Sequence, residues 1–490
     1  MKSSAPSDTS PPTSRPTGQS NPLAAPSPKL STGLPLISHE SADAVIAYRA
    51  GKPIRAGEFL AEVLRVAATL PAGGHVLNAC SDRYRFAVGF AAALVSNKVS
   101  LLPSTHTPEV IRELQVFAPD VFCLTDDPRC DIDLPRANYP VRVETSGNVT
   151  NLDAHREMVW PGPDIDSEQL AAYVFTSGST GTPQPYRKTW GRLVRCVRDG
   201  AQRLGLLDGR SYAVVGTVPP QHMYGFESTV LIALQTGAAI CSDHPFYPAD
   251  ICAALAAVPR PRVLVSTPVH LRTLVSSDVD LPAVDLVLSA TAPLSQNLAR
   301  EVEQRFDTQL QEIYGSTETG QIATRSTADT VEWRLWPGVQ LTSAEDRTWA
   351  SGGHVEQRTA MCDVIEITAE DRFLLHGRLA DLVNIAGKRS SLGYLNHQLN
   401  AIPGVLDGVF FLRDEAEPGG NSNGITRVAA AVVAPTLDAA TLSEQLRRRI
   451  DTVFLPRPLL FVDRLPRNAT GKLPRDALQA LVSKRVSPPE

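Results

Sequence analysis

The sequence lacks a long apolar run, a closely spaced cysteine pair and an excess of charge of one sign. No stretch approaches the roughly 18 consecutive apolar residues of a membrane-spanning helix. The seven cysteines are scattered without a CxxC pair, which indicates free thiols in a reducing compartment rather than a zinc site or a disulfide framework. With 47 basic and 52 acidic residues, the net charge of −5 offers no global attraction to nucleic acid. Because no apolar segment follows Lys2, we expect a cytoplasmic protein without a secretory signal.

The length and the local composition predict several parts. The chain has 490 residues, which suits two or three domains, and 43% of them are hydrophobic, which is enough to form a core. Residues 1–34 are rich in Ser, Pro and Thr and are predicted to form a disordered tail. The character of the sequence changes again near Leu379. We therefore predict a large N-terminal domain at 35–378 and a small α+β domain at 379–490.

A repeated alternation of short β-rich runs and helical patterns indicates the fold class. Helical patterns lie at about 86–95 and 108–117, and a further strand is expected at 428–433. The other predicted strands lie at 75–78, 99–102, 121–124, 212–218, 263–266 and 286–289. This order is typical of an α/β fold with parallel-rich sheets and crossover helices.

The most informative segment follows the apolar run Tyr173-Val174-Phe175. It consists of small or hydroxylated residues, namely Thr176, Ser177, Gly178, Ser179, Thr180, Gly181 and Thr182, before Pro183. Glycines permit positive φ, so that successive N–H groups can form a concave nest for oxyanions. The segment predicts a phosphate loop, and a flexible surface loop is the alternative. It has neither the Gly-Lys-Ser/Thr of a Walker loop nor the spacing of a hydrolase nucleophile elbow.

Three further segments carry charged residues beside glycines. In Ile313-Tyr314-Gly315-Ser316-Thr317-Glu318-Thr319-Gly320, a carboxylate next to a hydroxyl suits Mg²⁺, although a capped turn would look the same. The segment from His376 to Arg389 places basic and acidic residues around glycines. The segment at 465–475 puts Lys472 after Gly471, where a solvated charge is the alternative.

In this order and spacing the four segments resemble the adenylate-forming superfamily, which includes acyl-CoA synthetases, aryl-CoA ligases, luciferases and nonribosomal adenylation domains. The resemblance covers about residues 40–486. It implies ATP and Mg²⁺ as cofactors, a small carboxylic acid as substrate, a thiol as co-substrate and a mobile C-terminal domain.

The resemblance also implies roles for residues of the nucleotide site. The loop at 176–182 would close over the β- and γ-phosphates, and Ala290-Thr291-Ala292-Pro293 would pack along the adenine. Tyr314, followed by Gly315, would stack on the base. Thr317 would contact the α-phosphate, and Glu318 would hold Mg²⁺. Ribose hydroxyls would be bound by Asp363 and Arg378, and the mobile Lys472 would reach the carboxylate and the α-phosphate.

Further residues are assigned in the same way. The acid pocket would involve His222, Met223, Tyr224, Gly225 and Thr319. Ala380 and Asp381 would form the hinge, and Gly387 and Arg389 would present the thiol face. Bulk at Met223, Tyr224 and Phe226 suits a small or aromatic acid better than a long acyl chain, although the same side chains could simply fill the core.

The sequence departs from the superfamily pattern at several positions. Gln184 stands where the phosphate loop usually has Lys, and we expect Arg187 or Lys188 to compensate. Cys362 precedes Asp363 in place of the usual Gly, and Ala380 replaces a charged hinge residue. Tyr394 and Asn396 occupy positions that are usually Glu.

The run at 176–190 resembles the AMP ligases of aryl-polyene and xanthomonadin-type pigment pathways, which implies transfer of a hydroxybenzoate-like or related acid to the phosphopantetheine of an acyl carrier protein. Two basic groups could dock such an acidic partner, although solvated surface charge is the commoner explanation of such groups. They are Arg192, Arg195 and Arg198, and Arg447, Arg448 and Arg449. Free coenzyme A is the alternative thiol. A nucleotide-binding homologue without catalysis and a luciferase-like oxygenase are further alternatives.

Overall fold

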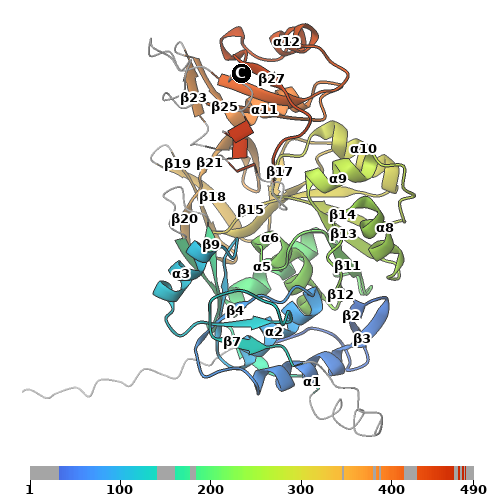
Figure 1. Cartoon of the computed structure of the whole chain (residues 1–490), viewed down its shortest axis with the longest axis vertical. Helices are drawn as coiled ribbons and strands as arrows, with labels where there is room; N and C mark the ends of the chain where they lie inside the picture. Colours follow the sequence, from blue (N-terminus) through green and yellow to red (C-terminus); the bar gives the residue numbers. More distant parts are fainter. Residues whose placement is uncertain are drawn as a thin grey trace, which may run out of the picture. The chain divides into compact units, whose positions relative to one another are not determined.

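The predicted alternation of strands and helices forms two large β-sheets in this computed structural model. The structure describes residues 33–140, 160–176, 184–344, 347–378, 382–385, 388–412, 428–467, 473–474, 477–478 and 480–481. Figure 1 shows the two sheets and the helices around them. The predicted α/β class with parallel-rich sheets is confirmed.

The first large sheet has six strands. In spatial order they are β10 (Gln184–Thr189), β9 (Leu170–Thr176), β5 (Val99–Leu102), β4 (His75–Asn78), β6 (Phe122–Thr125) and β7 (Arg136–Asn138). All neighbours are parallel except β10, which is antiparallel to β9. The helices α1 (Ala56–Ala67), α2 (Arg83–Val95) and α3 (Pro108–Phe117) belong to this half. Helix α2 is apolar on nearly every side, so it is buried in the main core rather than lying at the surface.

The second large sheet has eleven strands. In spatial order they are β21 (Asp363–Ala369), β22 (Arg372–Arg378), β17 (Trp333–Leu335), β16 (Gly320–Arg325), β15 (Leu310–Ser316), β14 (Leu286–Ser289), β13 (Arg262–Ser266), β11 (Ala213–Gly216), β12 (Ala239–Cys241), β2 (Val45–Arg49) and β3 (Lys52–Arg55). The run from β15 to β2 is parallel, and the strands at both ends are antiparallel. This run forms the core on which the candidate site is built.

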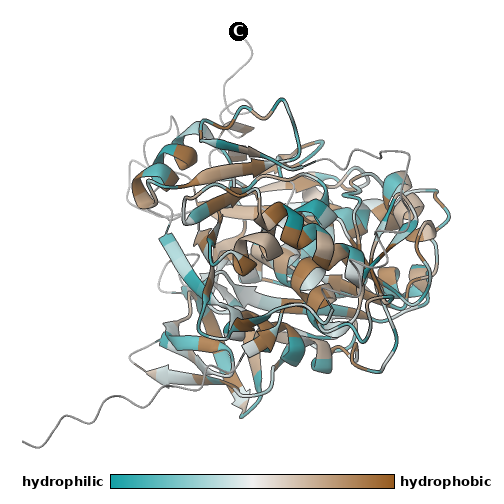
Figure 2. Cartoon of the chain, turned by 90° about the horizontal axis from the view of Figure 1, so that it is seen from below, coloured by the Kyte–Doolittle hydropathy of each residue, from teal (hydrophilic) through white to brown (hydrophobic). Residues whose placement is uncertain are grey.

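Helices cover both faces of the larger sheet. One set packs its apolar side chains on β11, β13 and β14 (Figure 1) and comprises α8 (Pro248–Ala256), α9 (Pro268–Val275) and α10 (Gln296–Phe306). The other set joins the main core and comprises α5 (Trp190–Arg203), α6 (Met223–Gly225), the π-helical η1 (Phe226–Leu231) and α7 (Ile232–Thr236). Figure 2 shows the apolar residues along the helices in the middle of the view.

Each large sheet has a point where the chain direction across the sheet reverses. In the larger sheet, β11 lies between β12 and β13, and in the six-stranded sheet β4 lies between β5 and β6. Ligands of open α/β sheets bind outside the carboxyl ends of strands at such points. The fold therefore directs attention to the loops that follow β11, β13, β14 and β15.

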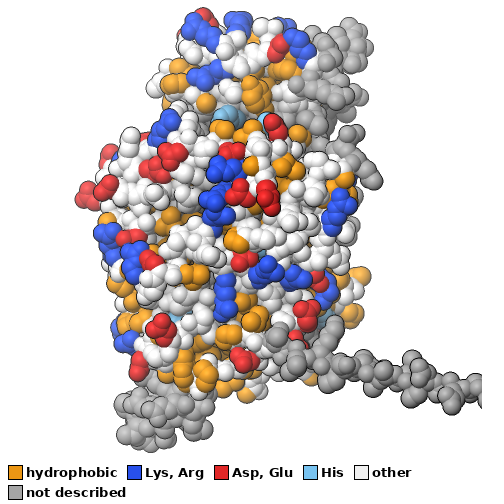
Figure 3. Space-filling view, turned by 180° about the vertical axis from the view of Figure 1, so that it is seen from behind, with side chains coloured by type: hydrophobic (Ala, Val, Ile, Leu, Met, Phe, Trp, Pro, Cys, Tyr) orange, Lys and Arg blue, Asp and Glu red, His pale blue; other side chains and the backbone are white. Residues whose placement is uncertain are grey.

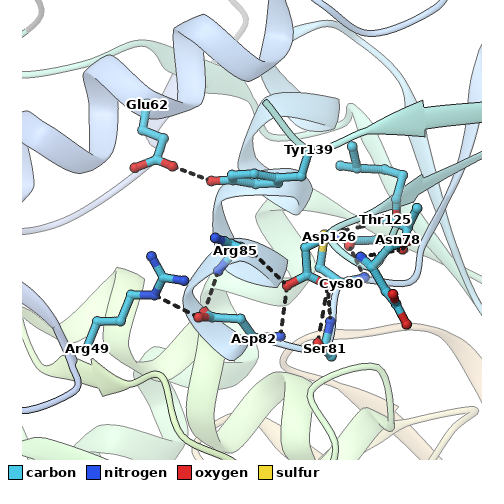
Figure 4. A network of polar contacts seen from close by, with 12 residues as sticks. Arg49, Glu62, Asn78, Cys80, Ser81, Asp82, Arg85, Thr125, Asp126 and Tyr139 are labelled. Atoms are coloured by element: carbon cyan, nitrogen blue, oxygen red, sulfur yellow. Dashed lines mark hydrogen bonds and ion pairs between the residues drawn. The ribbon is translucent and has the colours of Figure 1, made fainter. Parts of the chain in front are cut away.

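At the other reversal point, polar groups satisfy one another (Figure 4). Asp126, after β6, accepts hydrogen bonds from the N–H groups of Ser81 at 2.9 Å and Asp82 at 3.3 Å, after β4. Arg85 pairs with Asp126 at 3.4 Å, and Arg49 pairs with Asp82 at 2.8 Å. This network joins the two loops to each other, which indicates a structural role.

The C-terminal part has an apolar core made only of residues from Val383 onward. Its elements are β23 (Leu382–Ile385), β24 (Lys388–Ser391), α11 (Leu392–Asn400), β25 (Asp407–Leu412), β26 (Val428–Val433), α12 (Ala439–Arg447), the 3₁₀ turn η3 (Thr452–Phe454) and β27 (Leu459–Phe461). Strand β26 pairs antiparallel with β25 and parallel with β27. The division near Leu379 stays a prediction, because the contacts group Gly33–Glu490 as one unit.

Smaller elements complete the described chain. Strands β18 (Val339–Ala344), β19 (Arg347–Gly352) and β20 (Val355–Ala360) form an antiparallel sheet. Strand β1 (Gly33–Pro35) pairs with β8 (Asp164–Asp166). The disordered tail was predicted to extend to residue 34, but Gly33 and Leu34 lie in strand β1. Residues 1–32 lie outside the described residues. Among the described residues, no helix combines the length and the apolar character needed to cross a membrane.

Candidate active site

The loop between β15 and β16 carries the predicted phosphate and metal residues. Ser316 and Thr319 hold this loop from both sides, because their hydroxyl oxygens lie 3.1 Å apart and each accepts the other's N–H at 3.3 Å. Thr317 and Glu318 stand between them and are half-buried. The reciprocal bonds fix the backbone of the tip, so that these two side chains have a defined starting point for binding.

Gly320 closes this loop at a position that admits no side chain. Its φ is +77°, and a Cβ there would lie 2.8 Å from Oε1 of the buried Glu227. Positive φ together with this close approach requires glycine. The glycine allows the loop to pack directly on η1, which carries Glu227.

Tyr314 and Asp363 meet beside this loop, although the sequence places them far apart. The Tyr314 hydroxyl donates to Oδ2 of Asp363 at 2.5 Å. Asp363 also lies opposite Arg378 in the register of β21 and β22. The hairpin that these two strands form brings the two residues together, although 15 positions separate them in the sequence. The side chain of Arg378 lies outside the described residues. The predicted base-stacking residue and one predicted ribose residue are thus in contact.

Two aromatic residues that the sequence did not single out support Tyr314. The ring centroids of Trp333 and Phe373 each lie 5.5 Å from that of Tyr314. Both residues are buried, on β17 and β22. They fix the plane of the Tyr314 ring, and only the register of the sheet reveals this contact.

The turn at Ala290-Thr291-Ala292-Pro293 follows β14 at the carboxyl edge of the sheet. Thr291 has φ of +78°, which is rare for a β-branched residue and costs on the order of 1–3 kcal/mol. The N–H of Leu294 after the turn donates to Oε1 of Glu312 at 3.4 Å, and the other oxygen of Glu312 accepts from Arg325. Backbone strain of this kind is often found at functional turns, and the adenine contact of this turn stays a prediction.

The predicted acid-pocket segment follows β11 at the reversal point. His222 is the half-buried N-cap of α6, whereas Met223, Tyr224 and Gly225 are buried. Burial raises the pKa of the Tyr224 phenol well above its ordinary value, so the hydroxyl stays protonated. The segment turns tightly, because a Cβ at Gly225 would lie 2.1 Å from the Pro219 carbonyl oxygen.

A second polar group at the same edge was missed by the sequence analysis. The Thr217 hydroxyl oxygen lies 3.0 Å from that of Ser266 and 3.2 Å from Nδ1 of His270, and Thr267 contacts the same ring nitrogen at 3.0 Å. Thr217 and Thr267 follow β11 and β13 directly, Ser266 ends β13, and His270 lies in the first turn of α9. Their positions at two strand ends are the signal that could have identified them.

Several predicted site residues lie outside the described residues. They are Ser177, Gly178, Ser179, Thr180, Gly181, Ala380, Asp381, Gly387 and Lys472, together with the side chains of Thr176 and Arg389. The backbone still places the two ends of the predicted phosphate loop side by side, because Thr176 of β9 pairs with Gln184 of β10. The roles of these residues remain predictions.

The two residues expected to replace the loop lysine have other partners. Arg187 pairs with Glu356 at 3.0 Å. Lys188 is buried, and its Nζ donates to the main-chain carbonyl of Glu318 at 3.0 Å. Of the two, Lys188 therefore reaches the loop that carries the predicted metal residue.

The donors at the tip of the β15–β16 loop fit Mg²⁺. Glu318 offers a half-buried carboxylate next to the Thr317 hydroxyl, and Mg²⁺ prefers one or two carboxylates with water and phosphate oxygens. Burial, followed by the negative charge of the nearby Glu318 carboxylate, raises the pKa of the Tyr186 phenol. An oxygen-only donor set of this kind is compatible with a hard divalent cation.

Comparison with known proteins agrees with this geometry. A 4-coumarate–CoA ligase of Rhodobacter capsulatus is 29% identical over 313 residues, which cover 62% of this chain and 75% of that protein. A 3-hydroxybenzoate–CoA/4-hydroxybenzoate–CoA ligase of Thauera aromatica is 24% identical over 372 residues, covering 64% and 68%.

Solved structures share the fold. ATP-bound MatB from Rhodopseudomonas palustris superposes with a TM-score of 0.75 at 19% identity, covering 92% of this chain and 98% of that one. The o-succinylbenzoate CoA synthetase of Bacillus subtilis, with its acyl-adenylate, gives 0.71 at 17% identity, covering 89% and 95%. The model of the AMP-binding enzymes matches residues 39–346, a span that contains Tyr314 and Glu318. The chain belongs to the family of AMP-binding enzymes.

Proposed function

We propose that the protein activates a small aromatic carboxylic acid with ATP to form an acyl-adenylate and then transfers the acyl group to a thiol. The observation that carries the proposal is the contact of Tyr314 with Asp363 next to the tip that bears Thr317 and Glu318. Groups suited to a base, a ribose and a phosphate thus lie around one strand end. The relatives that act as acid–CoA ligases support the same reaction class.

The chemistry explains why this arrangement is needed. A carboxylate oxygen attacks the α-phosphorus, and the bond from that phosphorus to the bridging oxygen breaks, so that pyrophosphate leaves with the electron pair. Two anions must approach, and the enzyme lowers the barrier by positioning them and by placing positive charge and donors where negative charge gathers. When bound, Mg²⁺ neutralises charge on the phosphate oxygens.

The residues of the chain would divide this work. Tyr314 and Asp363 orient the nucleoside, and Thr317 donates to the α-phosphate. Glu318 holds the cation, and Lys472 brings positive charge to the carboxylate and the α-phosphate. In the second half-reaction, a thiolate attacks the acyl carbon, the bond to the AMP oxygen breaks and AMP is released.

The proposal of a small aromatic acid rests on the size and the polarity of the side chains in and after the predicted acid-pocket segment. Tyr224 and Phe226 are bulky and buried after β11, and this bulk favours a short acid over a long one. Close to them, the Gln321 amide donates to the Ser228 hydroxyl at 2.7 Å, so polar groups lie beside the apolar ones. An aromatic acid with a hydroxyl substituent, such as a hydroxybenzoate, matches this mixture, and one relative acts on hydroxybenzoates.

Coenzyme A is the acceptor that the relatives' activities support. An acyl carrier protein is the second candidate, and Arg447 favours it, because it is exposed near the end of α12; Arg448 beside it is also exposed but pairs with Glu444 at 2.6 Å. The other basic group gives less support. Arg192 and Arg198 donate to the Gly353 carbonyl and to Gln235 inside the protein, and Arg195 pairs with Asp199. On the face shown in Figure 3, basic and acidic side chains are interspersed.

A pyrophosphate-release screen tests the proposal. Benzoates, cinnamates and fatty acids are each supplied with ATP and Mg²⁺, and then with coenzyme A or with a phosphopantetheinylated carrier protein. We expect release with hydroxybenzoates or related aromatic acids, and one AMP for each thioester. Absence of acid-dependent AMP across the panel would contradict an enzymatic role and favour a nucleotide-binding protein without catalysis.

A further inference from the structure

Lys188 is a buried lysine with an unusual partner. It lies on β10, which begins at the end of the predicted phosphate loop, and only 8% of it is exposed. Its Nζ donates at 3.0 Å to the carbonyl oxygen of Glu318, 130 residues away. Lysine is almost never buried to this extent without a compensating interaction, so this position needs an explanation.

The surroundings of Lys188 include one buried carboxylate. Glu227 on η1 is 2% exposed, and its Oε1 accepts a hydrogen bond from Sγ of Cys196 at 3.1 Å. Burial lowers the pKa of Lys188, and the negative charge of Glu227 is the leading effect in the opposite direction. No direct ion pair between Lys188 and Glu227 is present within 4 Å among the described residues, so the short contact of the ammonium is the one to Glu318.

The contact joins two segments that the reaction needs together. Strand β10 is fixed along β9, because Lys188 pairs with Ala172 in the register. The Glu318 carbonyl belongs to the tip that Ser316 and Thr319 hold at its base. A charged donor on a rigid strand thus fixes the peptide group between Glu318 and Thr319. Charge-assisted hydrogen bonds of this kind are about twice as strong as neutral ones.

We propose that Lys188 is a positioning residue, whose ammonium holds the Thr317–Glu318 tip in the geometry that adenylation requires. The proposal rests on the proposed function for its effect on rate, whereas the effect on the backbone of the tip is independent of it. Lys188 does not contact the reacting atoms in this account. It acts through Glu318, the residue that would hold the cation.

The structure offers a competing role, in which Lys188 only neutralises Glu227. The two roles differ in what a second substitution does. If charge balance were the whole role, Lys188→Met combined with Glu227→Gln would restore the wild-type behaviour, because both buried charges would be gone. If the tether to Glu318 matters, the double variant regains stability without regaining an ordered tip.

The experiment compares wild-type protein with Lys188→Met, with the double variant Lys188→Met/Glu227→Gln, and with Lys98→Met as a matched control. Lys98 directly precedes β5 of the six-stranded sheet, is half-buried and donates to the Gly73 carbonyl at 2.7 Å. The readouts are amide hydrogen exchange of residues 315–321, the melting temperature, and acid-dependent ATP–pyrophosphate exchange.

We expect faster amide exchange at 315–321 in both Lys188 variants, and pyrophosphate exchange reduced by about tenfold or more. The Lys98→Met control should leave both unchanged. The proposal is overturned if the double variant matches wild type in both readouts. The double variant also keeps the test informative if the single variant does not fold. If wild-type protein shows no acid-dependent pyrophosphate exchange, the proposed function fails, and the amide exchange still decides whether Lys188 orders the tip.

Discussion

The hydroxyl of Tyr314 donates to the carboxylate of Asp363 at 2.5 Å, across 49 residues of sequence. Tyr314 lies near the carboxyl end of β15, the last strand of the parallel run. Asp363 is the first residue of β21, which forms the outermost antiparallel hairpin of the same sheet with β22. The bond therefore connects the parallel core to the strands that lead to the C-terminal part. The bond fixes the positions of the two side chains relative to each other, and we propose that both bind the nucleoside.

Substitution of Asp363 tests this interpretation. Asp363→Ala should weaken AMP binding by about tenfold or more, because it removes the carboxylate that would accept hydrogen bonds from the two ribose hydroxyls. Tyr314→Phe should have a smaller effect, since the ring keeps its place against Trp333 and Phe373. Titration calorimetry with AMP measures both. Asp371→Ala, which breaks an exposed pair with Arg334 on the same hairpin, is the control and should bind AMP normally.

Removal of the predicted mobile lysine should separate the two half-reactions. Lys472→Ala should abolish acid-dependent ATP–pyrophosphate exchange, because positive charge at the carboxylate and α-phosphate is lost, yet it should still convert a preformed acyl-adenylate to thioester. Both rates are measured on one preparation, with the exposed Lys52→Ala as the control. Exchange at the wild-type rate in Lys472→Ala would refute the role given to this lysine.

The predicted metal residue gives a prediction about cation dependence. Glu318→Gln keeps the size of the side chain but removes the charge that attracts Mg²⁺. We expect the Mg²⁺ concentration for half-maximal pyrophosphate release to rise by about tenfold or more, with a lower maximal rate. The exposed Glu366→Gln is the matched variant and should keep the wild-type magnesium dependence.

A buried histidine predicts how stability depends on pH. Burial lowers the pKa of His39 from 6.5 to about 4, and its Nε2 lies 3.1 Å from the Ala238 carbonyl oxygen. Below pH 6.5 the unfolded chain binds a proton that the folded chain does not, so acidification favours unfolding until the pH falls through about 4. When the pH is lowered from 7.5 to 5, His39 should therefore reduce the free energy of unfolding by about 2 kcal/mol.

Urea unfolding of wild-type protein and His39→Gln at the two pH values measures this effect. The variant should lose less stability on acidification than wild type by that amount. Equal losses would mean that His39 is not held neutral in the folded state.

Much of the fold was predictable because it depends on local patterns. The strands predicted at 75–78, 99–102, 286–289 and 428–433 have those bounds, and so does the helix at 108–117, since apolar runs and turn residues mark their ends. The helix expected at about 86–95 begins earlier, at Arg83, because the Asp82 side chain caps it. Local sequence did not indicate the strand at Gly33 and Leu34, because this strand forms by pairing with β8, more than 130 residues away.

The candidate site was predictable only where a motif marks it. Tyr314, Glu318 and Asp363 belong to segments that a resemblance can recognise. The residues that hold these side chains in place cannot be predicted from the sequence, because their contacts depend on sheet register or join segments more than a hundred residues apart. Lys188 is the clearest example, since the sequence indicates a cation near the phosphate loop, whereas its contact is the carbonyl of Glu318.

The most direct test of the account is the fate of an oxygen label. The protein is supplied with ATP, Mg²⁺, a thiol and an aromatic acid that carries ¹⁸O in both carboxylate oxygens, and the products are analysed by mass spectrometry. Attack of the carboxylate on the α-phosphorus predicts one ¹⁸O atom in the phosphate of each AMP released. Label in inorganic phosphate with formation of ADP, or AMP free of label, would contradict the account.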